Sequence, residues 1–276
     1  MPNIEHNGAH LQYQHHGTTG PNVLFIMGIA VSQAGWKPQV SPLSSHIHAI
    51  TFDNRGVGQS AGKAGLWTTA QLAEDARAVV DAADWDGFHV VGVSMGGMVA
   101  QELALSMPGR VHSLSLIATH PGGLVSLLPP LQGLSLFPKI VFGRRKTRLR
   151  AFSALLYPPS ERAAAVRRLT NGAPGLSWAP PAILAAQIAA VCRHNTHRRL
   201  HQLEHIPTLI LQPKRDVLVH PKGSTRLANA IPNATLVTFP DAGHGINVQS
   251  ATAVNQHLLQ HILAAETHRQ ASPDKE

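Results

Sequence analysis

Ser94 stands between two glycines in the segment GVSMG, residues 92–96, which matches the pattern G-x-S-x-G. The apolar run VVGV precedes it, and MVAQELALSM, with apolar residues three and four apart, follows it. A sharp turn between a strand and a helix holds a serine side chain clear of the sheet, where it can attack a carbonyl carbon. We therefore predict that Ser94 is a nucleophile and not merely a serine that suits a tight turn.

Two residues further along the chain could activate this serine. A serine hydroxyl needs a base to take its proton, and the base needs a carboxylate that fixes its tautomer. Asp216 follows the apolar run at 208–212, and His244 follows the apolar run at 234–239. Both residues are thus expected at the ends of strands on the same sheet edge as Ser94. Asp241 is a weaker alternative acid, because it is too close in sequence to His244 to reach across the imidazole ring easily.

The negative oxygen of a tetrahedral intermediate needs preorganised hydrogen-bond donors. One predicted donor is the backbone N–H of Met95, the residue after the serine, at the start of the helix. The second is the backbone N–H of Ile29, in the loop after the apolar run NVLFIM, where Gly28 lets the chain turn.

The elements that must position these residues alternate along the chain. Helical periodicity occupies 68–83 and 95–107, and it lies between short apolar runs rich in β-branched residues, typical of strands covered on both faces. These runs are residues 22–27, 48–53, 89–94, 113–118, 207–212 and 234–239. Strand and helix in alternation predict an α/β fold with a mostly parallel central sheet and helices on both faces.

This alternation stops between residues 120 and 205, where the sequence contains no clear strand. So long a segment without a strand predicts an inserted helical lid. We therefore predict an α/β core formed by residues 1–119 and 206–267, a lid at 120–205 and a disordered tail at 268–276.

Four segments together resemble the α/β-hydrolase fold superfamily, in the branch that carries a helical lid. They are MGIA at 27–30, FDNRGVGQS at 52–60, GVSMGG at 92–97 and DAGHG at 241–245. The resemblance extends from about residue 8 to 265 and implies a triad of Ser94, Asp216 and His244. Haloalkane dehalogenases and epoxide hydrolases of this plan use an aspartate nucleophile, so a serine argues against both. Many members have His-Gly at the first segment, where this chain has Met27-Gly28.

We predict a serine hydrolase that cleaves carboxylic esters of moderately apolar small molecules or lipids through an acyl-enzyme intermediate. The apolar segment 124–142 could line an acyl pocket or pack the lid onto the sheet. The same triad would serve lactone, amide or carbon–carbon bond hydrolysis, and some members of the superfamily are small-molecule receptors.

Composition limits the other classes of function. The 276 residues are 43% hydrophobic and 14% charged, which is globular, and the single cysteine, Cys192, excludes an internal disulfide. The net charge of +8 is concentrated partly at 143–150, GRRKTRLR. Without a nucleic-acid-reading motif, this segment predicts at most a weak peripheral contact with an anionic membrane.

No cofactor is expected, because the glycine-rich segments do not form G-x-G-x-x-G between a strand and a helix. Histidines do recur at helical spacing, at His194, His197, His201 and His205. Because no carboxylate accompanies them, we predict that the protein binds no metal. Neither a signal peptide nor a membrane-spanning run is evident, so the expected location is the cytoplasm.

Overall fold

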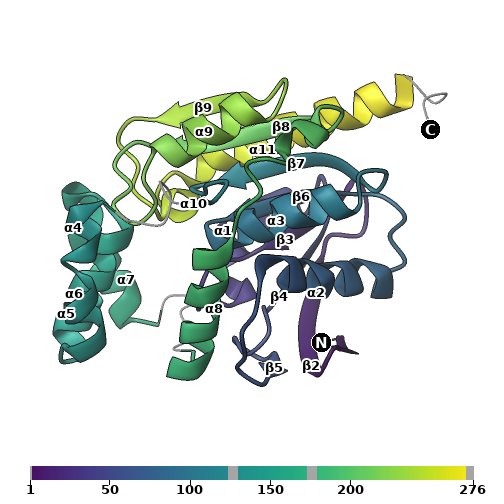
Figure 1. The fold of residues 1–276 in the computed structure, drawn as a ribbon. Helices are drawn as coiled ribbons and strands as arrows, with labels where there is room; N and C mark the ends of the chain where they lie inside the picture. The colour runs from purple at the N-terminus through teal and green to yellow at the C-terminus, as the bar shows by residue number, and fades with distance from the viewer. Residues whose placement is uncertain (1, 124–129, 173–178, 272–276) are drawn as a thin grey trace.

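The computed structural model describes residues 2–123, 130–172 and 179–271. Its centre is a nine-stranded sheet with the order β1-β2-β4-β3-β6-β7-β8-β9, with β5 paired to β2 (Figure 1). The strands are β1 (Asn3–His6), β2 (Ala9–His16), β3 (Asn22–Ile26), β4 (His48–Phe52), β5 (Ala61–Gly62), β6 (Phe88–Val93), β7 (Val111–Ile117), β8 (Thr208–Pro213) and β9 (Thr235–Phe239). In this spatial order, the strands from β4 through β3, β6, β7 and β8 to β9 are parallel to one another. Strands β1, β2 and β5 form antiparallel pairs at one end of the sheet. The predicted α/β fold with a mostly parallel sheet is confirmed.

Helices cover both faces of this sheet, and alternation within each strand supplies the two cores. In β3, for example, Leu24 and Ile26 face one core, whereas Val23 and Phe25 face the other. The first core is closed by α2 (Thr69–Ala82), α3 (Met95–Ser106) and α9 (Lys222–Ala230). The second is closed by the short helix η1 (Gln33–Trp36), α1 (Lys37–Leu43), α10 (Ile246–Gln249) and α11 (Ala251–Ala271). Strand β6, which leads into Ser94, thus lies in the buried middle layer.

The sequence analysis missed the N-terminal hairpin of β1 and β2. Strand β2 is not a continuous apolar run, because polar residues such as Gln12 separate Ala9, Leu11 and Tyr13, which pack in the first core. The turn between the strands is Asn7-Gly8, with φ of 46° and 71°. Asn-Gly with positive φ at both residues is a strong hairpin signal, and it could have identified this element.

Between β7 and β8 the chain forms what we call the helical insertion, residues 120–205. Its helices are α4 (Leu131–Leu134), α5 (Phe137–Phe142), α6 (Arg145–Leu156), η3 (Pro159–Glu161), α7 (Arg162–Thr170), α8 (Pro181–Arg193) and η4 (Leu200–Leu203). Helices α4 to α7 lie together beside the sheet, and α8 returns toward it (Figure 1). The described part of the insertion contains no strand. Residues 124–129 of its apolar segment lie outside the described residues.

The histidines of residues 194–205 do not share one helix, contrary to the expectation from their spacing. Helix α8 ends at Arg193, and His194 leaves it with φ −59° and ψ 128°. The His194 side chain is buried there against polar partners, whereas His197, His201 and His205 are exposed.

The predicted disordered tail, residues 268–276, overlaps the end of helix α11. Helix α11 continues to Ala271, so residues 268–271 are helical, while 272–276 lie outside the described residues. Arg269 extends the helix by pairing with Glu266, at 3.1 Å between Nη2 and Oε2. Such a basic residue in the last turn also favours the helix dipole. Of the helices in the described ranges, none combines the length and apolar character that crossing a bilayer requires.

Candidate active site

Ser94 occupies the sharp turn between β6 and α3. Its backbone has φ 57° and ψ −123°, a conformation that costs a non-glycine residue energy and is typical of functional sites. The turn is held on both sides, because the Ser94 amide donates to the Ile117 carbonyl at 2.9 Å and its own carbonyl accepts from the Gly97 amide at 3.0 Å. The predicted strand, turn and helix around Ser94 are therefore present.

Glycines let the end of β3 pass close to this turn. A Cβ on Gly96 would collide with the backbone carbonyl oxygens of Ile26 and Met27. A Cβ on Gly28 would lie 3.2 Å from the Ser94 Cβ and 3.7 Å from its Oγ. The loop that carries Ile29 therefore runs directly beside the serine, and Met95 begins the helix on its other side.

Asp216 and His244 meet at the same edge of the sheet. The His244 Nδ1 lies 2.7 Å from the Asp216 Oδ2, and their side chains are only 7% and 1% exposed. The other carboxylate oxygen, Oδ1, accepts from the amides of Leu218 and Val219, both at 2.8 Å. An ionised carboxylate only accepts hydrogen bonds, so Nδ1 carries the proton and Nε2 keeps a lone pair.

The structure places Asp216, and not Asp241, against the histidine. Asp241 instead forms an ion pair with Arg215 at 2.6 Å, and its side chain is 77% exposed.

Three side chains outside the predicted triad hold the loop after β3. Asn54 donates through Nδ2 to the Met27 carbonyl at 3.0 Å, and Asp53 accepts from the Gln33 amide at 2.6 Å. Burial raises the pKa of Asp53, against the backbone hydrogen bonds that lower it. From α8 of the insertion, Gln187 accepts through Oε1 from the Ala30 amide at 2.9 Å.

Of these three, Gln187 could not be found from the sequence. It lies 157 residues from Ala30, and no motif marks it.

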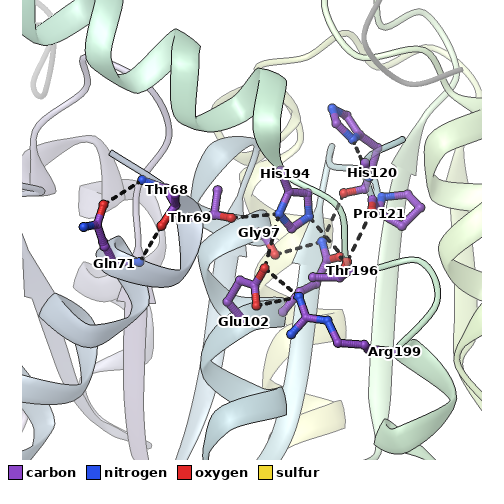
Figure 2. Close-up of polar contacts among 12 residues, drawn as sticks. Thr68, Thr69, Gln71, Gly97, Glu102, His120, Pro121, His194, Thr196 and Arg199 are labelled. Carbon is purple, nitrogen blue, oxygen red and sulfur yellow. Dashed lines mark hydrogen bonds and ion pairs between the residues drawn. The ribbon is translucent and has the colours of Figure 1, made fainter. Parts of the chain in front are cut away.

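A buried polar network joins the insertion to α3 (Figure 2). The His194 ring lies between Thr69 Oγ1, 3.0 Å from Nδ1, and Thr196 Oγ1, 3.4 Å from Nε2. Its Nδ1 is also 3.9 Å from Glu102 of α3, which Arg199 holds with two contacts of 2.9 Å. The end of the insertion is thus tied to the helix whose first turn follows Ser94.

Burial, with smaller contributions from the nearby His120 and Arg199, lowers the pKa of the His194 imidazole to about 3. Unfolding returns the ring to water, where its pKa is about 6.5, so protons bind the unfolded chain first as the pH falls. We expect the free energy of unfolding to be highest above pH 6.5 and to fall as the pH drops toward 3. The contribution of one such ring is about 1.4 kcal/mol per pH unit within this window.

Urea unfolding at several pH values checks this expectation. The variant His194→Gln, which can keep neutral hydrogen bonds, should show a shallower pH dependence than the wild type. The exposed His197→Gln should retain the wild-type slope. Equal slopes in both variants would contradict the assignment.

The sheet order, the turn at Ser94 and the Asp216–His244 pair define a hydrolase of the α/β type. The chain belongs to the α/β hydrolase fold family, whose model matches residues 21–251.

Individual relatives carry several different names. A protein of Agrobacterium fabrum, provisionally named carbamate hydrolase RutD, is 27% identical over 93% of this chain and 99% of its own length. A hydrolase from Pseudomonas aeruginosa superposes with a TM-score of 0.81 at 27% identity, covering 95% of this chain and 97% of its own. A Mycobacterium tuberculosis protein, provisionally named non-heme bromoperoxidase BpoC, superposes with a TM-score of 0.79 at 26% identity. The match covers 92% of this chain and 96% of that protein's chain. The comparisons therefore support a hydrolase without fixing the bond it cleaves.

Proposed function

We propose that the protein is a serine hydrolase that cleaves carboxylic esters of moderately apolar small molecules or lipids. The observation that carries this proposal is the Asp216–His244 hydrogen bond of 2.7 Å on the sheet edge where Ser94 occupies its strained turn. The pair supplies a base of fixed tautomer, and the turn supplies a hydroxyl held clear of the sheet.

In the proposed reaction, the His244 Nε2 takes the proton of Ser94 as Oγ bonds to the ester carbonyl carbon. The amides of Ile29 and Met95 donate to the oxygen that becomes negative. His244 then gives the proton to the departing alcohol, and an acyl group remains on Oγ. Water, deprotonated by the same nitrogen, adds to the acyl carbon, and the carboxylic acid leaves as Oγ recovers its proton.

A fluorophosphonate probe tests the nucleophile, and a series of p-nitrophenyl esters tests the reaction. We expect mass spectrometry to locate the probe on Ser94, and turnover to peak at one acyl length. Labelling at another residue, or labelling without repeated turnover of any ester, would contradict an esterase. Ligand-induced thermal shifts without turnover would favour a receptor on the same fold.

Carbamate hydrolysis is a second candidate, because relatives aligned over nearly the whole chain carry that name. A carbamate has the same carbonyl centre with a nitrogen substituent, so the proposed steps would be unchanged. The ratio of kcat/KM for a p-nitrophenyl ester and a p-nitrophenyl carbamate of equal chain length decides between them.

A further inference from the structure

Three potential metal ligands converge at the opposite edge of the sheet from Ser94. His89 is the second residue of β6, His112 is the second residue of β7, and Glu266 lies on α11. The Glu266 Oε1 is 3.0 Å from the His89 Nε2 and 3.1 Å from the His112 Nδ1. One ligand atom from each of the three residues lies within 4.8 Å of the others.

Further contacts hold each ligand in place. The His89 Nδ1 is 2.8 Å from the Ser113 Oγ, so a hydrogen bond fixes the ring from behind. Arg269 donates to the second oxygen of Glu266, Oε2, at 3.1 Å and more weakly to Oε1 at 3.4 Å, so it holds the carboxylate while Oε1 also faces the two rings. Metal-binding histidines and carboxylates are commonly oriented by such outer contacts.

Gly87 makes room for the third ligand. A Cβ on Gly87 would collide with the His112 ring at Nε2 and Cε1. The ring can therefore take its present position only beside a residue without a side chain.

We propose that His89, His112 and Glu266 bind a divalent transition-metal ion of the zinc type. Two imidazole nitrogens and one carboxylate oxygen are a ligand set that zinc uses with an open fourth position. Ligands about 2.1 Å from a tetrahedral ion lie roughly 3.4 Å apart, close to the two measured separations of 3.0 and 3.1 Å. A surface cavity of about 660 Å³, lined in part by His112, Glu266 and Asn22, gives the fourth position access to solvent.

The ion would tie α11 to the starts of two central strands. Ser94 lies five positions after His89 along extended β6, which places the two sites roughly 16 Å apart. The site is therefore independent of the proposed hydrolysis, and we expect zinc to raise the Tm without acting on the ester carbonyl.

This inference departs from the prediction of no metal. That prediction considered histidines at helical spacing in one segment, whereas these ligands come from three elements brought together by the fold.

Calorimetric titration of the full-length protein with Zn²⁺, after chelator treatment and dialysis, tests the site. We expect one tight site per chain, above weaker binding by surface histidines, and a rise in Tm at saturation. Co²⁺ at the same site should give the visible absorption of a tetrahedral ion. Absence of a tight site in the folded wild type would overturn the proposal and leave the three side chains as a hydrogen-bonded group.

Variants distinguish this site from the other histidines of the chain. Glu266→Gln and His112→Ala each remove a ligand, and Gly87→Ala keeps all three ligands but displaces the His112 ring. Each should weaken the tight site at least about tenfold. The controls are His201→Gln in the exposed run and Gly109→Ala, where a Cβ meets nothing within 4 Å. Circular dichroism establishes that each variant is folded, and wild-type affinity in folded Glu266→Gln and Gly87→Ala would refute the assignment.

Discussion

Replacement of Ser94 by alanine is expected to lower kcat for ester hydrolysis by about 10⁴- to 10⁶-fold, because no other group can form the acyl-enzyme. The residual rate would come from the amides and the binding of substrate alone. The fold should be retained, because the Ser94 side chain makes no capping hydrogen bond to α3. Stopped assays with the best ester of the series measure the loss.

Ser115→Ala is the matched control for this variant. Ser115 is a fully buried serine of β7 whose Oγ has no hydrogen-bond partner in the described structure. Its replacement should leave kcat within about twofold of the wild type, since it removes no group near the carbonyl. A Ser94→Ala enzyme that still turns over at the wild-type rate would refute the proposed mechanism.

Replacement of Arg55 by methionine is expected to lower the free energy of unfolding by about 3–5 kcal/mol. Arg55 donates two hydrogen bonds of 2.5 Å to the carboxylate of Asp75 on α2, and the two side chains are 11% and 1% exposed. Without the guanidinium, a buried carboxylate loses its partner. Burial already raises the pKa of Asp75 against the opposing effect of Arg55, so the variant should be least impaired at acid pH, where the carboxyl is neutral.

Urea unfolding at pH 7 and pH 5 measures this loss, and an exposed pair on the same helix provides the control. Arg77 and Glu74 lie 2.6 Å apart with side chains 44% and 41% exposed. Arg77→Met should cost less than about 1 kcal/mol, because water solvates both charges. The double variant Arg55→Met with Asp75→Leu should recover much of the loss. A loss below 1 kcal/mol for Arg55→Met alone would show that the buried pair contributes little.

The sequence was sufficient for the parallel core and for the positions of the proposed triad. Ser94, Asp216 and His244 each follow an apolar strand, and local pattern alone indicates where such a strand ends. The N-terminal hairpin was missed because β2 is not a continuous apolar run: polar residues separate its core residues Ala9, Leu11 and Tyr13.

Contacts between segments that are distant in the sequence could not be predicted from local sequence patterns. The spacing of His194 and the histidines after it indicates a helix, although the fold ends the helix at Arg193 and buries His194 beside Thr69, 125 residues away. The histidines of the proposed zinc site are two among 18 in the chain, and only the packing of α11 brings Glu266 to them. Such partners can be found only after the tertiary structure is known.

The hydrogen bond from the Ala30 amide to Gln187 couples two events that are usually considered separately. Any movement that carries α8 away from the sheet strips this amide of its acceptor, and the Ile29 amide belongs to the same loop. In the proposed mechanism, where this loop receives the negative oxygen, docking of α8 and the conformation of the loop therefore share one equilibrium. By linkage, a ligand that favours the docked position of α8 favours the catalytic conformation of the loop by the same free energy. Substrates too small to contact the insertion would lose that contribution, so we expect selectivity in kcat as well as in KM.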